Sequence, residues 1–412
     1  MRSLATLLLL SGCASGSQEA PPAARPNVVL IVGDDQHWGD FGFMGHAGIR
    51  TPRLDRLAAE SLVYPNAYVP TSLCRASLAT ILTGQYAHQH KICCNDPPDG
   101  VDRAAMLPFL RNSPTIPRLL QAKGYKSFQT GKFWEGHFSN GGFTHGMTLT
   151  GRHGQEGLVI GRQTMKPITD FIESCGKDPF FVWYAPMMPH EPHNPPERLL
   201  SKYAAPDRNP KLAKYWAMCE WFDETCGQLL DHLDAKGLRE NTIVAFVIDN
   251  GWIQETGPVR TTRGNFAPKS KLSPYDGGLR SPILIRWPGR AKPGLHPDLA
   301  STIDLAPTLL RACGVEPPAP MGGLDLLGPP LARDAVFGDL YVHTSKDVDR
   351  PALNLTHRWV REKDWKLIVP QEGRPELYQV ERDPHEVKDL AAAEPARVEA
   401  LRRRLDAWWS GR

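Results

Sequence analysis

Residues 27–35 read NVVLIVGDD, and this stretch decides the fold. The run 27–32 is too short for a helix and rich in β-branched side chains, so it predicts a central strand buried on both faces. Comparable runs occur at residues 125–128, 180–184, 242–248 and 283–287. Apolar residues recur at helical spacing between them, at residues 54–62 and 212–233. This alternation predicts an α/β fold with a mainly parallel sheet covered by helices on both faces.

The segment 315–334 (VEPPAPMGGLDLLGPPLARD) is rich in proline and glycine and interrupts the alternation. We therefore predict a main domain over residues 26–320 and a smaller α+β subdomain over residues 321–412. Short antiparallel strands are expected in the subdomain at residues 359–360, 365–369 and 376–380. The chain is expected to end in a helix whose apolar face carries Val398, Leu401, Leu405 and Trp408.

The composition excludes several classes of protein. The chain has 412 residues, 41% of them hydrophobic, which is ample for a packed core. Its 48 Lys and Arg residues are nearly balanced by 45 Asp and Glu residues, so we expect no nucleic-acid partner and no polybasic membrane surface. The apolar run at residues 4–10 is far shorter than the roughly 20 residues that span a bilayer.

The first 25 residues are typical of a targeting segment. Arg2 precedes the apolar run 4–10, and the sequence Leu10-Ser11-Gly12-Cys13 resembles a bacterial lipobox. We predict that Cys13 becomes the lipidated first residue of the mature protein and that residues 14–25 form a flexible tether. The alternative is an ordinary cleaved signal with an incidental cysteine. Both interpretations predict export to the periplasm or cell envelope, and the lipidated protein would contact the membrane only through its lipid anchor.

Polar residues follow several of the predicted strands. Asp34 and Asp35 follow the first strand, and Asp249 and Asn250 follow the strand at 242–248. Because the carboxyl ends of parallel strands meet at one edge of a sheet, these four side chains are expected to converge there. Carboxylate and amide oxygens favour Ca²⁺ or Mg²⁺ over zinc. Taken singly, each aspartate could instead be a turn former or an N-cap.

Lys132 and His190 follow two other predicted strands and are expected at the same edge. A lysine and a histidine beside a metal ion suit a tetrahedral oxyanion, whose charge they would neutralise. The alternative is that Lys132 is a solvated loop residue and His190 is satisfied by its neighbours. For His193, three residues further on, we favour a purely structural role.

Cys74 is the candidate nucleophile. Residues 71–84 read TSLCRASLATILTG, in which Thr71 or Ser72 is expected to cap a helix that ends at Gly84. Cys74 would then lie at the helix N-terminus, where free N–H groups and the dipole lower the pKa of a thiol and bind anions. The alternative is a plain buried cysteine.

Together these residues resemble the type I sulfatases of the alkaline phosphatase-like superfamily, from residue 26 to residue 409. The landmarks are residues 26–35, residues 51–58 (TPRLDRLA), Cys74 with Ala76, Ser77 and residues 83–84, Lys132, His190, residues 249–251 (DNG), Lys271 with residues 275–278 (YDGG), residues 304–310 (DLAPTLL) and residues 365–368 (WKLI).

The resemblance implies that a formylglycine-generating enzyme oxidises Cys74 to formylglycine, whose hydrated form attacks the sulfur of a sulfate ester. It implies that Lys132, Lys271 and His190 bind and stabilise the sulfuryl group. It also implies a site for Ca²⁺ or Mg²⁺, with the ligands Asp34, Asp35, Cys74 (as formylglycine), Asp249 and Asn250. Residues 26–320 would be the catalytic domain, and the expected substrate is a sulfated carbohydrate.

The sequence departs from the family pattern at two positions. Leu78 stands where the signature carries an arginine, and Trp134 replaces a second family histidine. Arg75 and His137 are candidate substitutes for these two residues. Two alternative functions stay open: a phosphodiester or phosphonate hydrolase on the same scaffold, and a non-catalytic pseudosulfatase that binds sulfated glycan.

Overall fold

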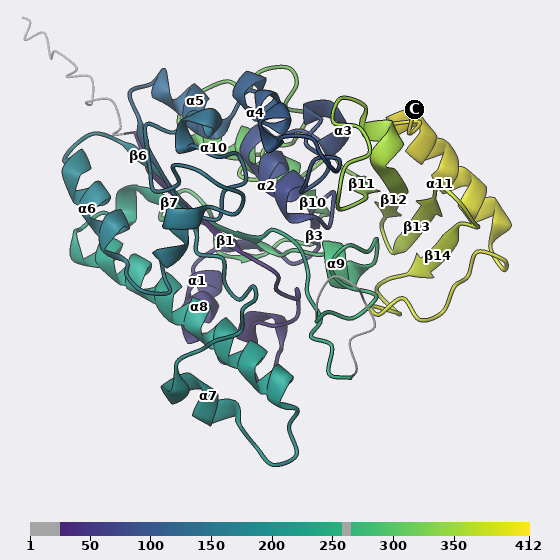
Figure 1. Cartoon of the computed structure of the whole chain (residues 1–412), viewed down its shortest axis with the longest axis horizontal. Coiled ribbons are helices and arrows are strands. Elements are labelled where there is room, and N and C mark those ends of the chain that lie inside the picture. Colours follow the sequence, from purple (N-terminus) through teal and green to yellow (C-terminus); the bar gives the residue numbers. More distant parts are fainter. Residues whose placement is uncertain (1–24, 258–264) are drawn as a thin grey trace, which may run out of the picture.

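A computed structural model describes residues 25–257 and 265–412. Its main feature is an eight-stranded sheet in the order β5-β4-β6-β1-β7-β8-β2-β9 (Figure 1). The strands are β1 (Asn27–Gly33), β2 (Leu62–Tyr64), β4 (Lys126–Gly131), β5 (His145–Gly146), β6 (Phe180–Ala185), β7 (Thr242–Ile248), β8 (Ile283–Arg286) and β9 (Gly294–Leu295). A separate parallel pair joins β3 (Ala67–Tyr68) to β10 (Ala300–Ser301).

Strand β1 lies in the centre of the sheet and pairs in parallel with β6 on one side and β7 on the other. Its side chains alternate between two hydrophobic clusters, as a strand of period two requires. Val28, Leu30 and Val32 belong to one cluster. Val29 and Ile31 belong to the other. The predicted central strand, buried on both faces, is therefore confirmed.

Helices cover both faces of this sheet (Figure 1). On one face lie α2 (Cys74–Thr83), α5 (Ile116–Gln121) and α10 (Leu305–Ala312). On the other lie α1 (Pro52–Ala59), α6 (Lys166–Cys175) and α8 (Pro210–Ala235). Helix α8 begins with Pro210 at its first position, and the side chain of Asn209 accepts a hydrogen bond from the backbone N–H of Lys211. The predicted two-sided α/β architecture is confirmed.

Some local predictions need correction. Leu62, which the helical spacing placed at the end of the first helix, lies instead in β2. Strand β4 extends through Thr130 and Gly131, beyond the predicted end at residue 128. Strand β8 runs antiparallel to β7, so the sheet is mainly but not wholly parallel. Short apolar runs give no information on strand direction, because direction depends on the connections between strands.

A four-stranded antiparallel sheet forms near the C-terminus, in the order β11-β12-β13-β14. Its strands are β11 (Ala335–Tyr341), β12 (Leu355–Glu362), β13 (Trp365–Pro370) and β14 (Glu376–Gln379). Helix α11 (Pro395–Trp408) packs on this sheet through Leu401 and Leu405. The sequence predicted the last three strands and the helix but not β11.

Shorter elements complete the described chain: α3 (Ala87–His90), α4 (Pro108–Asn112), α7 (Glu197–Tyr203), α9 (Asp276–Leu279), and the 3₁₀ helices η1 (Gly42–Met44), η2 (Arg103–Met106), η3 (Phe138–Gly141), η4 (Gln155–Val159), η5 (Arg239–Asn241), η6 (Thr302–Asp304) and η7 (Pro351–Asn354). No helix within residues 25–257 and 265–412 is long and apolar enough to cross a membrane. The predicted signal, with Cys13 and most of the tether, lies outside the described residues.

Candidate active site

Four adjacent parallel strands, β4, β6, β1 and β7, deliver polar side chains to one edge of the main sheet. Asp34 and Asp35 follow β1, and Asp249 and Asn250 follow β7. Lys132 and His190 come from the segments after β4 and β6. The sequence prediction that these residues share one edge of the sheet is therefore confirmed as geometry. Lys271 and Cys74 join them from a loop before α9 and from the start of α2.

Asp35 is held by residues from three other segments. Its Oδ2 lies 2.6 Å from Lys271 Nζ and 3.3 Å from His190 Nε2, and its Oδ1 accepts a 2.7 Å hydrogen bond from Asn250 Nδ2. The backbone of Asp35 has a φ of 58°, a left-handed conformation that aspartate adopts more readily than most residues. Burial alone would raise the pKa of Asp35, but Lys271 and His190 hold it well below its usual range.

Lys132 lies between the two carboxylates that come from β1 and β7. Its Nζ is 2.6 Å from Asp34 Oδ1 and 3.5 Å from Asp249 Oδ2, and the side chain is 1% exposed. Gly131 makes this placement possible, because its φ is 70° and a Cβ there would lie 1.8 Å from the carbonyl oxygen of Ala185. Burial would lower the pKa of Lys132, but the surrounding acidic groups raise it well above its usual value.

The acidic residues have the properties expected of cation ligands. Asp34 Oδ2 is buried and has no hydrogen-bond partner among the described residues, which is costly for a carboxylate oxygen. Burial and the charge of Asp34 raise the pKa of Asp249 well above its usual range. Ligand atoms of Asp34, Cys74 and Asp249 lie within 4.8 Å of one another, as do those of Asp34, Asp35 and His190. This donor set fits a hard divalent cation, which would satisfy Asp34 Oδ2 and offset the crowded negative charge.

Cys74 is the first residue of α2, as the sequence predicted, but two details differ. Neither Thr71 nor Ser72 caps the helix; Leu73 occupies the N-cap position and makes no side-chain capping bond. Burial also raises the pKa of the Cys74 thiol to about 12, because loss of solvent outweighs the nearby lysines. The prediction of a lowered thiol pKa is therefore wrong. Cys74 Sγ lies 3.3 Å from Asn250 Oδ1, beside the acidic residues.

His190 is fixed by its neighbour. Its Nδ1 lies 2.6 Å from the carbonyl oxygen of Glu191, which can only accept a hydrogen bond, so Nδ1 carries the proton and Nε2 faces Asp35. Burial lowers the pKa of His190. His193 packs against Tyr215 and Trp252 and does not line the pocket described below, in agreement with its expected structural role.

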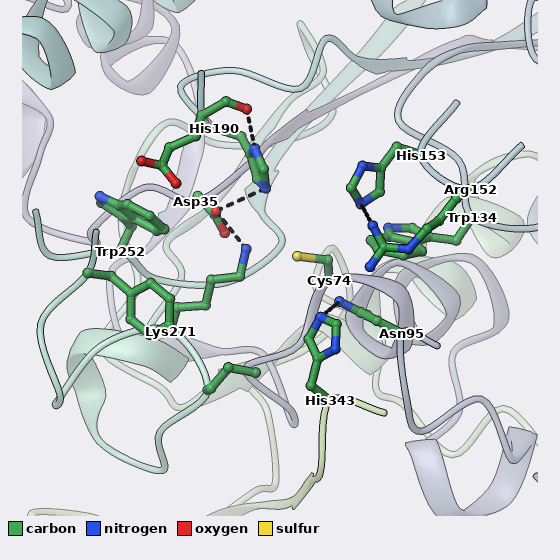
Figure 2. Close-up of a pocket in the computed structure, with 13 residues that line it drawn as sticks. Asp35, Cys74, Asn95, Trp134, Arg152, His153, His190, Trp252, Lys271 and His343 are labelled. Carbon is green, nitrogen blue, oxygen red and sulfur yellow. Dashed lines mark hydrogen bonds and ion pairs between the residues drawn. The ribbon is translucent and has the colours of Figure 1, made fainter. Parts of the chain in front are cut away.

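A pocket of about 170 Å³ opens over these residues (Figure 2). It is lined by Asp35, Cys74, Asn95, Trp134, Arg152, His153, His190, Glu191, Trp252, Phe266, Lys271, Leu272 and His343. Cys74 lies between two groups of side chains. Asp35, His190 and Lys271 lie on one side, and Trp134, Arg152 and His153 lie on the other. The pocket therefore presents the thiol to any molecule that enters.

The two candidate substitutes for the missing family residues do not line this pocket. The guanidinium of Arg75 is buried and bonds both carboxylate oxygens of Glu135, at 2.6 and 2.8 Å. His137 is exposed and bonds Ser139. Leu78 is buried in the hydrophobic cluster of the α2 face. Arg75 therefore stabilises the segment around Cys74 from behind and does not replace an arginine in the pocket.

Sequence reasoning missed Arg152 and His153, which line the pocket from the loop before η4. The His153 ring lies 4.2 Å from the Trp134 ring, and the Arg152 guanidinium lies 4.8 Å from the Trp134 centroid. His153 thus lies beside the position where the family has its second histidine. No local motif marks these residues, because a loop of residues 147–154 outside any regular element brings them over Trp134. Asn95 and His343 were also missed, because they too lie outside helices and strands and no local motif marks them.

The family assignment follows from matches that cover most of the chain. Residues 26–315 match the family model for sulfatases, and residues 266–407 match the model for the C-terminal region of N-sulphoglucosamine sulphohydrolase. The chain belongs to the sulfatase family. Sulfuric ester hydrolase is thus its class of enzyme, as the sequence predicted.

One curated relative and two solved structures are similar to this chain. An ulvan-active sulfatase from Formosa agariphila is 26% identical, over 98% of this chain and 84% of the relative. A structure solved with its substrate, D-glucosamine-2-N,6-O-disulfate, has a TM-score of 0.77 at 21% identity, covering 94% of this chain and 98% of the other. A phosphonate monoester hydrolase from Agrobacterium radiobacter has a TM-score of 0.70 at 19% identity, and the match covers 93% of this chain and 95% of the other. Likeness at these identities shows the shared fold.

Proposed function

We propose that this sulfatase hydrolyses a sulfate ester on a carbohydrate, with formylglycine derived from Cys74 as the nucleophile and a divalent cation beside it. The observation that carries the proposal is the convergence of Cys74, three aspartates, Asn250 and two lysines at one edge of the sheet, where Cys74, Asp35 and Lys271 line the pocket. Cys74 Sγ is 3.3 Å from Asn250 Oδ1, and Lys271 and His190 line the same pocket. The relatives that act on ulvan or bind a sulfated glucosamine support the choice of a carbohydrate.

Asp34, Asp35, Asp249 and Asn250 would hold Ca²⁺ or Mg²⁺, because they supply hard oxygen ligands from two strand ends. When bound, the cation supplies positive charge close to the nucleophile and the sulfuryl oxygens. Oxidised and hydrated, residue 74 supplies a hydroxyl nucleophile, and a formylglycine-generating enzyme is the expected partner. Without the cation, burial raises the pKa of the Cys74 thiol to about 12, so an unmodified cysteine would carry almost no thiolate near neutral pH.

The side chains of the pocket have separate tasks in this proposal. Lys271 and Lys132 neutralise charge on the sulfuryl oxygens, each held in position by a carboxylate 2.6 Å away. His190 donates from Nδ1 to a carbonyl, which directs Nε2 into the site; Nε2 can donate to the sulfuryl group or to the leaving oxygen when it is protonated as well. Burial around Cys74 excludes water, which strengthens each of these electrostatic interactions.

A second candidate activity is hydrolysis of a phosphodiester or phosphonate. It is favoured by the fold shared with a phosphonate monoester hydrolase, and by the fact that sulfate and phosphate esters are both tetrahedral anions. Leu78 and Trp134 are compatible with a third possibility, binding of sulfated glycan without turnover.

A rate comparison distinguishes these functions. The purified, modified holoenzyme is assayed on an aryl sulfate and on an aryl phosphate diester, with Cys74→Ala as the control. The proposal predicts faster hydrolysis of the sulfate and loss of that activity in C74A. Preferential hydrolysis of the phosphodiester would favour the second activity. Binding of sulfated glycan with no turnover of either ester would favour the non-catalytic protein.

We also propose that the protein is exported and anchored in the cell envelope through a lipid on Cys13. The lipobox-like sequence Leu10-Ser11-Gly12-Cys13 supports this location. Cell fractionation of the native protein tests it. Recovery from the cytosol with residues 1–12 intact would contradict both export and lipidation.

A further inference from the structure

The pocket has a wall that the proposed reaction does not use. We call it the distal wall and define it as Asn95, Trp134, Arg152, His153 and His343. In Figure 2 its members Trp134, Arg152 and His153 lie across Cys74 from Asp35 and Lys271. Every member of the distal wall carries nitrogen donors, and none of its five residues carries a carboxylate. A substrate held at Cys74 would therefore meet a donor-rich surface on its far side.

Arg152 is held firmly but keeps part of its hydrogen-bonding capacity. Asp96 accepts two hydrogen bonds of 2.6 Å, from Nε and Nη2 of Arg152, and Arg152 Nη1 lies 3.1 Å from His153 Nε2. A guanidinium carries five N–H donors, so two of them, one on each Nη, are left without an acceptor among the described residues. The Arg152 side chain is 41% exposed and stacks on Trp134. Its orientation is thus set before any ligand binds.

The charge behind the distal wall is not balanced. Asp96 is shared by Arg152 and by Arg103, whose Nη1 lies 3.2 Å from Asp96 Oδ1. Two guanidinium groups therefore meet one carboxylate. The nearby carboxylate of Glu135 does not correct the excess, because Arg75 takes both of its oxygens. Both guanidinium groups lie against Trp134, with Cζ atoms 5.2 and 4.8 Å from the ring centroid.

His153 is neutral in this setting. Burial and the charges of Lys132 and Arg152 lower its pKa. Since Arg152 Nη1 can only donate, His153 Nε2 accepts, and the proton is assigned to Nδ1. The ring thus adds a donor to the wall without adding charge, and the positive excess belongs to the two arginines.

We propose that the distal wall is a subsite for a second anionic group of the substrate, a carboxylate or a second sulfate, with Arg152 as its main ligand. The inference rests on the proposed function, since it assumes that a sulfate ester occupies the pocket beside Cys74. Arg152 offers two N–H groups to such an anion. The negative charge of the anion would balance the positive charge that Asp96 alone does not neutralise. The preferred substrate is therefore an acidic or multiply sulfated sugar, and a singly sulfated neutral sugar is a poorer one.

The test measures selectivity with two matched sugar sulfates. Both carry the same scissile sulfate; one is a neutral glycoside and the other carries a carboxylate or a second sulfate. The unaltered holoenzyme is expected to have the higher kcat/KM on the second compound. Arg152→Gln should lower kcat/KM on that compound about ten- to a hundredfold and lower it far less on the neutral one. Arg152→Lys keeps the charge but not the planar donors. Its kcat/KM on the doubly anionic compound should lie between those of the unaltered enzyme and R152Q.

Arg198→Gln is the matched control. Arg198 also makes a two-pronged ion pair with a carboxylate, that of Glu224, but it lies outside the pocket. Its replacement should leave the ratio of the two kcat/KM values as it is in the unaltered enzyme. Equal losses on both compounds in R152Q, or no loss on either, would overturn the inference.

Failure of the proposed function would look different, because the unaltered enzyme would then hydrolyse neither compound. In that case the dissociation constants of the same two compounds, measured by calorimetry, still decide the inference. Tighter binding of the doubly anionic compound that is lost in R152Q supports the subsite. Equal binding of both compounds overturns it.

Discussion

Lys132 and Lys366 are buried to nearly the same degree in two different regions of the molecule. Lys132, after β4, is 1% exposed and has Asp34 and Asp249 beside its Nζ. Lys366, on β13, is 0% exposed and has Asp276 and Glu386 beside its Nζ, at 2.8 and 2.9 Å. By burial and ion pairing alone, either cluster could be taken for the active site.

The two clusters differ in the partners of their carboxylate oxygens. In the C-terminal cluster, Asp276 Oδ1 bonds Lys366, and Asp276 Oδ2 accepts a 2.7 Å hydrogen bond from Tyr68. In the candidate active site, Asp34 Oδ2 has no partner among the described residues. Glu386 Oε1 of the C-terminal cluster also makes no hydrogen bond among the described residues, but it lies 2.9 Å from Lys366 Nζ in an ion pair. This cluster joins the small sheet to α9 through Lys366 and Asp276. The site around Lys132 differs in that its carboxylates lie within 4.8 Å of further possible metal ligands, where the proposed cation would satisfy Asp34 Oδ2.

The largest effect is expected from Asp249→Ala, which removes a cation ligand. We expect loss of the bound Ca²⁺ or Mg²⁺ and a fall in sulfate ester hydrolysis of at least about a thousandfold, because charge stabilisation by the metal is worth several kcal/mol. Metal analysis of the purified variant, beside its hydrolysis rate, checks this. Asp231→Ala, at an exposed carboxylate paired with Arg53, is the control and should keep its metal. Unchanged metal content in D249A would show that the assignment is wrong.

Lys132→Met tests whether the cluster around Lys132 is functional. We expect kcat of the metal-loaded enzyme to fall about 10²–10³-fold, the usual cost of removing one group that stabilises developing charge. Because the proposed cation would still face Asp34 and Asp249, the thermal unfolding midpoint of the metal-loaded variant should change less than that of Lys366→Met. If kcat stayed within a few-fold of the unaltered enzyme, Lys132 would be a structural residue like Lys366.

Lys366→Met tests whether the C-terminal cluster around Lys366 serves stability alone. Removal of one partner from a buried charge cluster leaves unpaired carboxylates and should lower the free energy of unfolding by about 3–5 kcal/mol. Denaturant unfolding measures this loss. The rate of hydrolysis per folded molecule should fall much less than in K132M. The reverse order of the two rate effects would contradict the distinction drawn here.

The smallest effect is a pH dependence of the C-terminal cluster. Burial raises the pKa of Glu386 from its ordinary 4.5 to about 7, so the folded protein binds this proton more tightly than the unfolded chain does. The stabilisation is therefore present at low pH and is lost as the pH rises from about 4.5 to about 7. Glu386→Gln should flatten this part of the stability profile, measured by unfolding at several pH values. The exposed Glu372→Gln should keep the slope of the unaltered protein.

The main sheet and the polar residues at its edge could be predicted from the sequence, because their signals are local. A strand such as β1 is an apolar run followed by polar residues, and parallel pairing brings the ends of such strands together. Asp34, Asp35, Asp249 and Lys132 were found in this way.

The distal wall and the C-terminal cluster could not be predicted, because they depend on tertiary contacts. Arg152 and His153 lie in a loop without periodicity, and their position over Trp134 follows from how that loop folds back on β4. The raised pKa of Cys74 was missed for a related reason: a helix start is visible in the sequence, but the burial that outweighs it is not.

The most direct test of the central claim relates the chemical state of residue 74 to activity. The peptide that carries Cys74 is analysed by mass spectrometry in preparations from the native host that differ in their extent of modification, and sulfate ester hydrolysis is measured on the same samples. We predict that the rate rises in proportion to the fraction of formylglycine and approaches zero for the intact thiol. Full activity in a preparation whose Cys74 is entirely an alkylatable thiol would contradict the account.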